Sequence, residues 1–132
     1  MIVVDASAAV EMLLGTKLGL RVEEVALATD ALHAPHLLDA EVLQVLRRFV
    51  ARKQLAAARA AEAVEDLAAF PLRRHAHLGL LGRVFDLRHN LTAYDAIYVA
   101  LAEALDATLL TCDKALAQAA GITAAVEVVV ES

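Results

Sequence analysis

Several residue types that mark other protein classes are scarce in this sequence. A single cysteine, Cys112, excludes an internal disulfide and suits a reducing compartment. Tryptophan is absent and aromatic residues make up 4%, so a broad stacking surface is not expected to be the main device for binding single-stranded nucleic acid. No stretch reaches the roughly 18 uncharged apolar residues that suggest a membrane span. The N-terminal segment has no basic start, and acids interrupt its apolar run, unlike a signal peptide. We therefore expect a cytoplasmic protein without a membrane segment.

Positive charge is also in the minority. Lys and Arg number 12 against 17 Asp and Glu, which gives a formal net charge of -5. This balance excludes a general basic coat for nucleic acid but leaves room for local basic patches. Hydrophobic residues make up 60%, which excludes a disordered chain. The length of 132 residues predicts one domain, spanning 1–132, that buries a core without disulfides.

Strand and helix patterns alternate along the chain. Short apolar or β-branched runs predict strands at 1–4, 32–34, 72–74, 107–111 and 126–130. Helical spacing predicts helices at 6–14, 18–28, 56–70, 77–87, 92–105 and 113–120, and one more that starts at Pro35 and carries Leu38, Val42, Val45 and Phe49 on one face. Gly15 and Gly121 are expected to end helices. The alternation predicts an α/β protein whose mainly parallel sheet, of about four to five strands, is covered on both faces.

Four acidic residues lie where solvated acids are not expected. Asp5 and Asp113 follow predicted strands, whose carboxyl ends are the usual ligand-binding edge of an open parallel sheet. Glu41 and Asp95 lie near the starts of helices and adjoin apolar faces, so we expect them at the same edge. Four carboxylates gathered there would repel one another unless a cation held them. A set of oxygen ligands suits Mg²⁺ or Mn²⁺ rather than zinc.

Each acid also has a purely structural interpretation. Asp5 and Asp113 would cap the helices that follow their strands. The segment from Thr92 to Asp95 resembles a capping box, and Glu41 would be a first-turn acid favoured by the helix dipole. Capping alone, however, does not explain why all four acids would meet at one edge.

These acids lie in segments that resemble a known family. VVDASA, APHLLDAEVLQVLRR, RHNLTAYDAIYVALAEAL and LLTCD, in this order, are similar to the PIN domain, and specifically to VapC-type toxins of bacterial toxin–antitoxin pairs. The resemblance covers nearly the whole chain. It implies a three-layer α/β/α endoribonuclease that acts on structured RNA such as tRNA or rRNA. It also implies metal binding by Asp5, Glu41, Asp95 and Asp113.

The resemblance assigns supporting roles to other polar residues. It implies polar support from Ser7 and Thr111 and a place for Thr92 at the rim of the site. A divalent ion would acidify a water, orient the phosphate and screen charge. Asp5 would be its central ligand, and Glu41 would hold a water or act as general base. The sequence leaves open whether one metal ion or two take part.

An RNA substrate would need positive charge around this acidic site. The candidate residues are Arg47, Arg48, Arg83, Arg88, His89 and Lys114. The cluster just before Thr92 is the strongest of these, because it opens the helix that carries Asp95. The resemblance also implies a cognate antitoxin protein and a homodimer. The Ala-rich helices between Leu37 and Phe70 are the expected dimer contact.

Other functions compete with this interpretation. A zinc site is one alternative, because the chain has five histidines. However, no cysteine pair accompanies them, and their spacing is unfavourable for binding one ion. A receiver-type signalling domain has a similar length and Mg²⁺-binding acids, yet here Asp5 is followed by Ala instead of a second acid. A catalytically idle PIN scaffold used for binding is the remaining alternative, although all four acids are present.

Overall fold

A single all-parallel sheet forms the centre of the molecule. The computed structural model describes residues 1–131. Within them the strands are β1 (Ile2–Val4), β2 (Leu32–Pro35), β3 (Leu72–His75), β4 (Thr108–Thr111) and β5 (Val126–Val128). Their order in the sheet is β3-β2-β1-β4-β5, and every neighbouring pair is parallel. The predicted sheet is confirmed, with five strands and no antiparallel pairing among the described residues.

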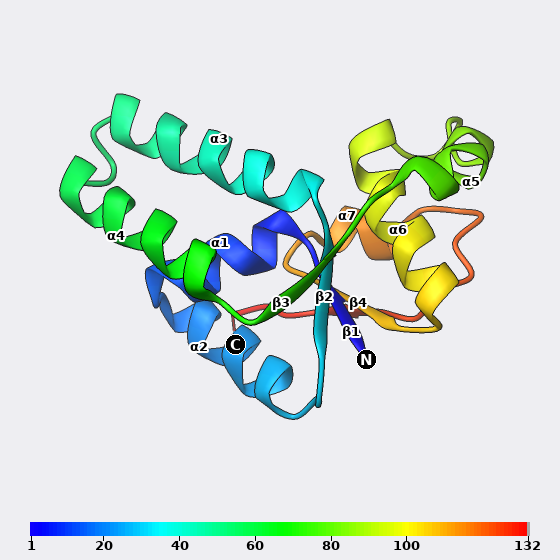
Figure 1. The fold of residues 1–132 in the computed structure, drawn as a ribbon, viewed down its shortest axis with the longest axis horizontal. Helices are drawn as coiled ribbons and strands as arrows, with labels where there is room; N and C mark the ends of the chain where they lie inside the picture. Colours follow the sequence, from blue (N-terminus) through cyan, green and yellow to red (C-terminus); the bar gives the residue numbers. More distant parts are fainter. Residues whose placement is uncertain (132) are drawn as a thin grey trace.

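Helices cover both faces of this sheet, as predicted. The chain forms α1 (Ala6–Leu14), α2 (Lys17–Leu27), α3 (Leu37–Ala51), α4 (Ala57–Ala69), the 3₁₀ helix η1 (Leu78–Leu80), α5 (Leu81–Asp86), α6 (Ala93–Leu105) and α7 (Lys114–Gln118). Helices α1 to α4 lie on one side of the sheet, and α5 and α6 lie on the other (Figure 1). This is the three-layer α/β/α arrangement. Among the helices within residues 1–131, none combines the length and apolar character needed to cross a membrane.

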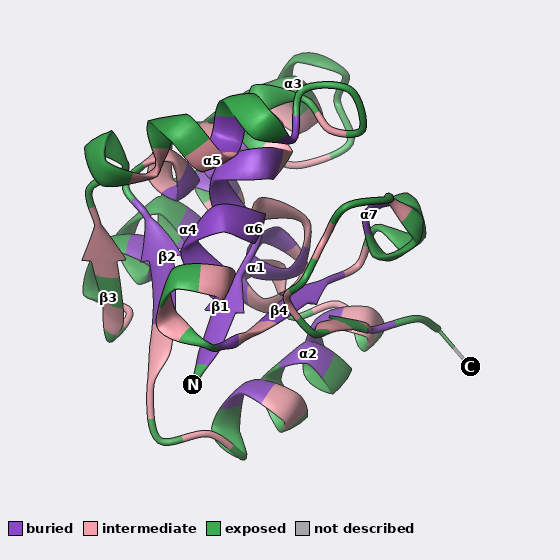
Figure 2. Ribbon diagram, turned by 90° about the vertical axis from the view of Figure 1, so that its right-hand side faces the viewer, coloured by how far each residue is buried: buried purple, intermediate pink, exposed green. Residues whose placement is uncertain are grey.

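The core is formed by the central strands and by α6. Val3, Val4, Leu109 and Leu110 are fully buried between the two helical layers. Helix α6 is buried on all sides from Ala96 to Ala102, which accounts for its nearly continuous apolar sequence. Figure 2 shows the same division, with buried residues concentrated in β1, β2, β4 and α6 and exposed residues on the outer helices.

Three predicted helix boundaries are wrong. Pro35 ends strand β2 instead of opening a helix, and α3 begins only at Leu37. Strand β1 pairs with β2 only up to His33, so no ladder bond to β1 is lost at the proline. The predicted helix at 77–87 divides into η1 and the short α5. Gly121 does not end α7, which stops at Gln118.

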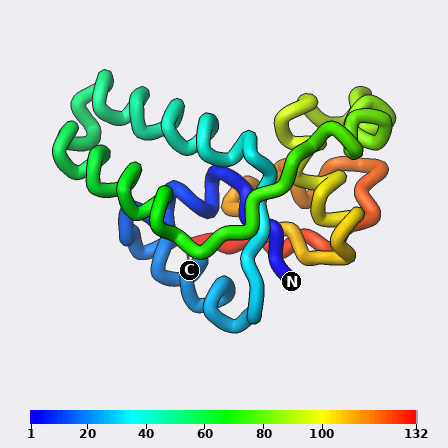
Figure 3. Tube along the Cα trace, viewed as in Figure 1, coloured from blue at the N-terminus to red at the C-terminus, as the bar shows by residue number. Residues whose placement is uncertain are grey.

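The carboxyl ends of the central strands lie between two pairs of helices. Figure 3 traces the α3–α4 hairpin on one side and the α5–α6 pair on the other, with the carboxyl ends of the central strands between them. The chain winds outward from β1 to β2 and β3, then returns to β4 and β5. The direction of winding therefore reverses between β1 and β4, and ligands of open α/β sheets bind at such a reversal.

Candidate active site

Asp5 occupies the point of reversal. It follows β1, its backbone N–H donates to the Leu110 carbonyl of β4 at 3.1 Å, and only 7% of the residue is exposed. Its Oδ1 accepts from the Ala8 N–H at 3.0 Å, so the predicted helix cap is confirmed. The same oxygen accepts from the Ser7 hydroxyl at 2.7 Å, and Oδ2 accepts from the hydroxyl of Thr111. The carboxylate is thus held in one orientation.

Ser7 and Thr111 connect this carboxylate to the end of β4. The Ser7 hydroxyl accepts from the N–H of Cys112 at 3.0 Å, and Thr111 Oγ1 accepts from the N–H of Asp113 at 3.0 Å. Thr111 is fully buried. Asp113 itself is exposed and caps α7 by accepting from the Ala115 N–H at 2.9 Å. The two strand ends therefore share one hydrogen-bond network.

Glu41 approaches the site from the opposite helix pair. It lies on α3, is half-buried, and its Oε1 accepts from the hydroxyl of Tyr98 at 2.5 Å. Tyr98 lies on α6 and is 2% exposed. This bond links the helix of Glu41 to the helix of Asp95. We did not single out Tyr98 from the sequence, although its position one turn after Asp95 placed it on the same helical face.

Asp95 lies in the first turn of α6. The hydroxyl of Thr92 accepts from the backbone N–H of Asp95 at 3.2 Å and caps the helix. This bond uses the backbone N–H of Asp95, and hydrogen bonding from Thr92 also acts to lower the pKa of the Asp95 carboxyl, against the larger effect of burial. A concavity of about 180 Å³ brings Thr92, Asp95 and Asp113 together with Asn90. Helix capping and a place at a shared site are therefore compatible for Asp95 and Asp113.

The acids influence one another electrostatically. Burial raises the pKa of Asp5 above its ordinary value, and the Asp95 carboxylate raises it further, against the hydrogen bonds that Asp5 accepts. Burial likewise raises the pKa of Glu41, with Asp95 and Asp5 adding to the rise. Burial and Asp113 raise the pKa of Asp95. Carboxylates that raise each other's pKa repel one another, so added positive charge would stabilise their ionised forms.

The donor chemistry of the site fits a hard divalent ion. All four acids offer oxygen ligands, and the mutual repulsion just described favours added positive charge. The acids do not form a complete coordination site, because residues 1–131 contain no group of three or more His, Cys, Asp or Glu side chains placed to hold an ion. Burial raises the pKa of Cys112 to about 11, which disfavours a thiolate nucleophile.

The predicted basic residues are distributed unevenly around this site. Arg88, His89 and Lys114 are exposed near it, on the segment before α6 and at the start of α7. Arg83 is engaged elsewhere: its guanidinium donates to Glu103 at 2.7 and 3.0 Å and to the Gly121 carbonyl at 2.8 Å.

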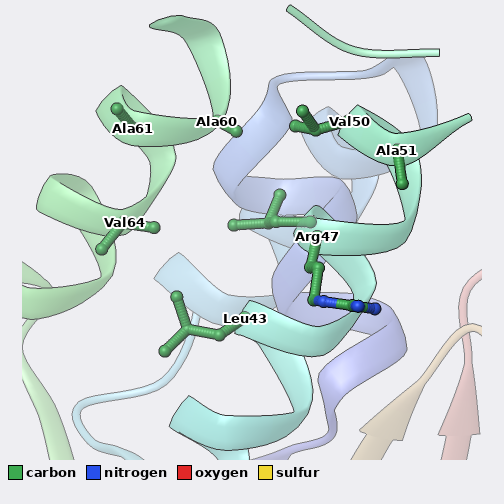
Figure 4. A pocket seen from close by; sticks show the side chains of 8 residues that line it. Leu43, Arg47, Val50, Ala51, Ala60, Ala61 and Val64 are labelled. Atoms are coloured by element: carbon green, nitrogen blue, oxygen red, sulfur yellow. The ribbon is translucent and has the colours of Figure 1, made fainter. Parts of the chain in front are cut away.

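The other two candidate arginines lie further along α3. Arg47 and Arg48 are both exposed, about two turns beyond Glu41 on the same helix. Arg47 borders a groove between α3 and α4, which Figure 4 shows from close by. The groove has a volume of about 470 Å³, and its other lining residues are apolar: Leu43, Leu46, Val50, Ala51, Ala60, Ala61 and Val64.

Two further polar contacts lie outside the acidic edge. His33 Nδ1 and His75 Nε2 are 2.8 Å apart, joining β2 to β3. The two residues are 42 apart in the sequence, and no third ligand joins them among the described residues. Arg74 donates to both carboxylate oxygens of Asp39 at 2.8 to 3.1 Å, tying β3 to α3. Both contacts join residues far apart in sequence.

Comparison with known proteins places this chain in a family. The PIN-domain family model matches residues 2–122. The chain belongs to the PIN-domain family. Within it, the VapC9 ribonuclease of Mycobacterium tuberculosis is 43% identical over 113 residues, covering 86% of each chain. The chain therefore belongs among the VapC-type PIN proteins, and the resemblance inferred from the sequence is confirmed.

Solved structures support the same fold. VapC20 of Mycobacterium tuberculosis, a toxin that cleaves the sarcin–ricin loop, superposes with a TM-score of 0.69 at 16% identity, covering 93% of this chain and 97% of that one. VapBC2 of Rickettsia felis, bound to a DNA fragment from its promoter, gives a TM-score of 0.70 at 13% identity, covering 98% of this chain and all of that one. At these identities the likeness establishes the fold alone.

Proposed function

We propose that this chain is a metal-dependent endoribonuclease, the toxin of a toxin–antitoxin pair. The observation that carries the proposal is Asp5, a buried carboxylate fixed at the winding reversal of the sheet and coupled to the charges of Asp95 and Glu41. The VapC9 relative is named a ribonuclease, and VapC20 is described as a toxin that cleaves the sarcin–ricin loop. The same class of substrate suits this site, and tRNA or rRNA is the proposed target.

The side chains would divide the work according to their environments. Asp5 would be the fixed ligand, because Ser7, Thr111 and the Ala8 amide hold its orientation. Asp95 and Asp113 would supply further oxygen ligands from the neighbouring concavity. Glu41, oriented by Tyr98, would accept a proton from the attacking water or hold that water in place.

Mg²⁺ is the proposed ion, with Mn²⁺ as a substitute. Such an ion supplies charge neutralisation at the phosphate and makes a nearby water more acidic. The four carboxylates offer oxygen ligands, and burial raises the pKa of the neighbouring Cys112 thiol to about 11, which together favour a hard ion over zinc. Positive side chains at the rim would offset the remaining repulsion of the RNA backbone. Arg88, His89 and Lys114 are the residues proposed for this role, because they are exposed near the site. Arg83 is engaged by Glu103, and Arg47 and Arg48 lie further along α3.

Two protein partners belong to the proposal. A cognate antitoxin would cover the acidic site, as the resemblance implies, and the VapBC2 neighbour supports such a pairing. A homodimer is proposed through α3 and α4, where Leu43 and Val64 are exposed beside the apolar groove. Light scattering at tens of micromolar tests the dimer, and a monomer would contradict it. Because the proposed substrate is tRNA or rRNA, we propose that the toxin acts in the cytoplasm.

Neither alternative is favoured by these findings. The PIN-domain match over residues 2–122 does not favour a receiver-type signalling domain. Retention of all four acids does not favour an idle scaffold.

Sequencing of new RNA 5′ ends tests the proposed reaction. Total bacterial RNA is incubated with the purified protein in Mg²⁺ or in EDTA, and the 5′ ends are mapped. We expect a small set of discrete new ends in Mg²⁺ only. Identical ends in both samples, or none in either, would contradict the proposal.

A further inference from the structure

The few aromatic side chains of this protein divide sharply by exposure. Tyr98 is in the core, and Phe49 and Phe70 are half-buried. Phe85 and Tyr94 are 65% and 61% exposed. A single exposed apolar side chain is ordinary, whereas exposed apolar side chains that gather in one region mark a binding surface. Both exposed rings belong to the α5–α6 segment that leads into the acidic concavity.

Phe85 carries a stacked cation. The guanidinium carbon of Arg88 lies 4.3 Å from the centroid of the Phe85 ring. One guanidinium nitrogen of Arg88 also donates to the Phe85 carbonyl at 3.1 Å. These two contacts hold a flat cation against a flat ring at the surface. Such a pair offers a stacking face together with a positive charge for a phosphate.

Tyr94 directly precedes Asp95 in the sequence. It occupies the first turn of α6, between the capping residue Thr92 and the candidate ligand Asp95. Those two neighbours line the concavity of about 180 Å³, together with Asn90. Arg88 precedes Asn90 by two residues, so the Phe85–Arg88 pair and Tyr94 lie at the two ends of one short segment at the rim.

Stacking on these rings avoids the electrostatic repulsion that the acidic site exerts on RNA. Four carboxylates and a net charge of -5 oppose the approach of an RNA backbone. Nucleobases are uncharged at neutral pH, so stacking on a ring is not opposed by the acids. The low aromatic content excludes a broad stacking surface, but two rings at the rim suffice for one or two bases. In a continuous duplex the bases are already stacked and unavailable.

We propose that the Phe85–Arg88 pair and Tyr94 form a stacking platform that binds unpaired bases of the RNA beside the acidic site. The platform selects a single-stranded segment over a continuous duplex. This inference rests on the proposed ribonuclease function and adds the residues that recognise its substrate. A second copy of the chain is the competing occupant, because Leu78 and Leu81 on η1 and α5 are also exposed. The stacked cation on Phe85 and the position of Tyr94 beside Asp95 favour RNA.

Binding measured without cleavage tests the platform directly. The probes are a single-stranded uridine oligonucleotide and a duplex, each of about 12 nucleotides, in EDTA. Phe85→Leu and Tyr94→Leu keep apolar bulk but remove the ring. We expect each to weaken single-strand binding by about fivefold or more, as for the loss of one stacked base, and to leave duplex binding unchanged. Phe70→Leu is the matched control, since Phe70 precedes β3 at the opposite edge of the sheet.

A spectroscopic readout complements the affinities. The chain contains no tryptophan, so Tyr94→Trp introduces a single reporter. Its fluorescence should be quenched by the single-stranded oligonucleotide and not by the duplex. Unchanged affinity in both ring variants, or no quenching, would overturn the platform. A shift in light scattering from dimer to monomer with unchanged RNA affinity would assign the face to a second copy and also overturn it. Absence of cleavage by the parent protein in Mg²⁺ would count against the proposed function, while the binding data would still decide the platform.

Discussion

The hydroxyl of Tyr98 donates to Oε1 of Glu41 at 2.5 Å across 57 residues of sequence. It is the contact that links α6, which carries Asp95, to α3, which carries Glu41. Burial raises the pKa of Tyr98 and the bond to Glu41 raises it further, so the phenol stays protonated and remains a donor. Glu41 is thereby held in one orientation relative to the helix that carries Asp95.

Removing this donor should affect both stability and activity. Tyr98→Phe keeps the buried ring and deletes the hydroxyl. We expect a loss of about 1 to 2 kcal/mol in unfolding free energy, because the half-buried Glu41 carboxylate loses a hydrogen-bond donor that water replaces only in part. RNA cleavage should slow, since Glu41 loses its orientation. Urea unfolding and initial cleavage rates measure the two effects. Thr29→Val removes a hydroxyl far from the acids and should leave the rate unchanged; a parent-like rate in Tyr98→Phe would contradict the positioning role.

A pH dependence should arise from Glu103, away from the acidic site. Hydrogen bonds from Arg83 and Thr123 lower the pKa of Glu103 from 4.5 to about 2, against a smaller opposing effect of burial. Because the folded-state pKa is below the unfolded value, the stabilisation is complete above pH 4.5 and is lost as the pH falls toward 2. Glu103→Gln should lower the unfolding free energy at pH 7 by about 1 kcal/mol and flatten its dependence on pH below 4.5. Urea titrations across this range measure the slope, and equal slopes in both proteins would refute the assignment.

Close packing of α1 against α2 depends on Gly19. A Cβ at this position would lie 1.9 Å from the Glu11 carbonyl oxygen, which is backbone and cannot move aside cheaply. Gly19→Ala should therefore destabilise the protein by about 1 to 3 kcal/mol. Gly82→Ala is the matched control, because a Cβ there meets nothing within 4 Å and should be neutral or stabilising. Thermal unfolding compares the two variants. Similar melting temperatures would show that α1 and α2 can move apart enough to admit the methyl group, and would contradict the prediction.

Metal binding should be visible as stabilisation. An ion that binds only the folded state adds about 2.7 kcal/mol at a hundredfold excess over its dissociation constant. We expect millimolar Mn²⁺ to raise the melting temperature relative to EDTA, and Asp5→Asn to reduce that rise. No upward shift in the parent protein would contradict a metal site at these acids.

Much of this fold follows from local patterns. The β-branched runs predict the strands, and the apolar stretch around Asp95 predicts α6, because a helix buried on all sides needs apolar residues on all sides. Acids that directly follow strands fall at one edge once the sheet is parallel. The placement of Asp5 and Asp113 could therefore be predicted without knowledge of any long-range contact.

Contacts between distant segments could not be predicted in the same way. Pro35 is compatible with a first helical turn or with a strand end, and only the register of β2 against β3 decides. His33 and His75 meet because that register places their strands side by side. The Tyr98–Glu41 bond depends on how α6 and α3 cross the sheet. No local periodicity specifies these alignments.

The most direct test of the account is RNA cleavage by Asp95→Asn. The helix cap uses the Asp95 backbone and the Thr92 hydroxyl, so the substitution should leave the unfolding free energy within about 1 kcal/mol of the parent value. Asp66→Asn, on the exposed side of α4, controls for the loss of one negative charge. In Mg²⁺ we predict that Asp95→Asn folds normally and loses cleavage, while Asp66→Asn cleaves like the parent. Cleavage by purified Asp95→Asn at near the parent rate would contradict the central claim that this carboxylate edge performs the reaction.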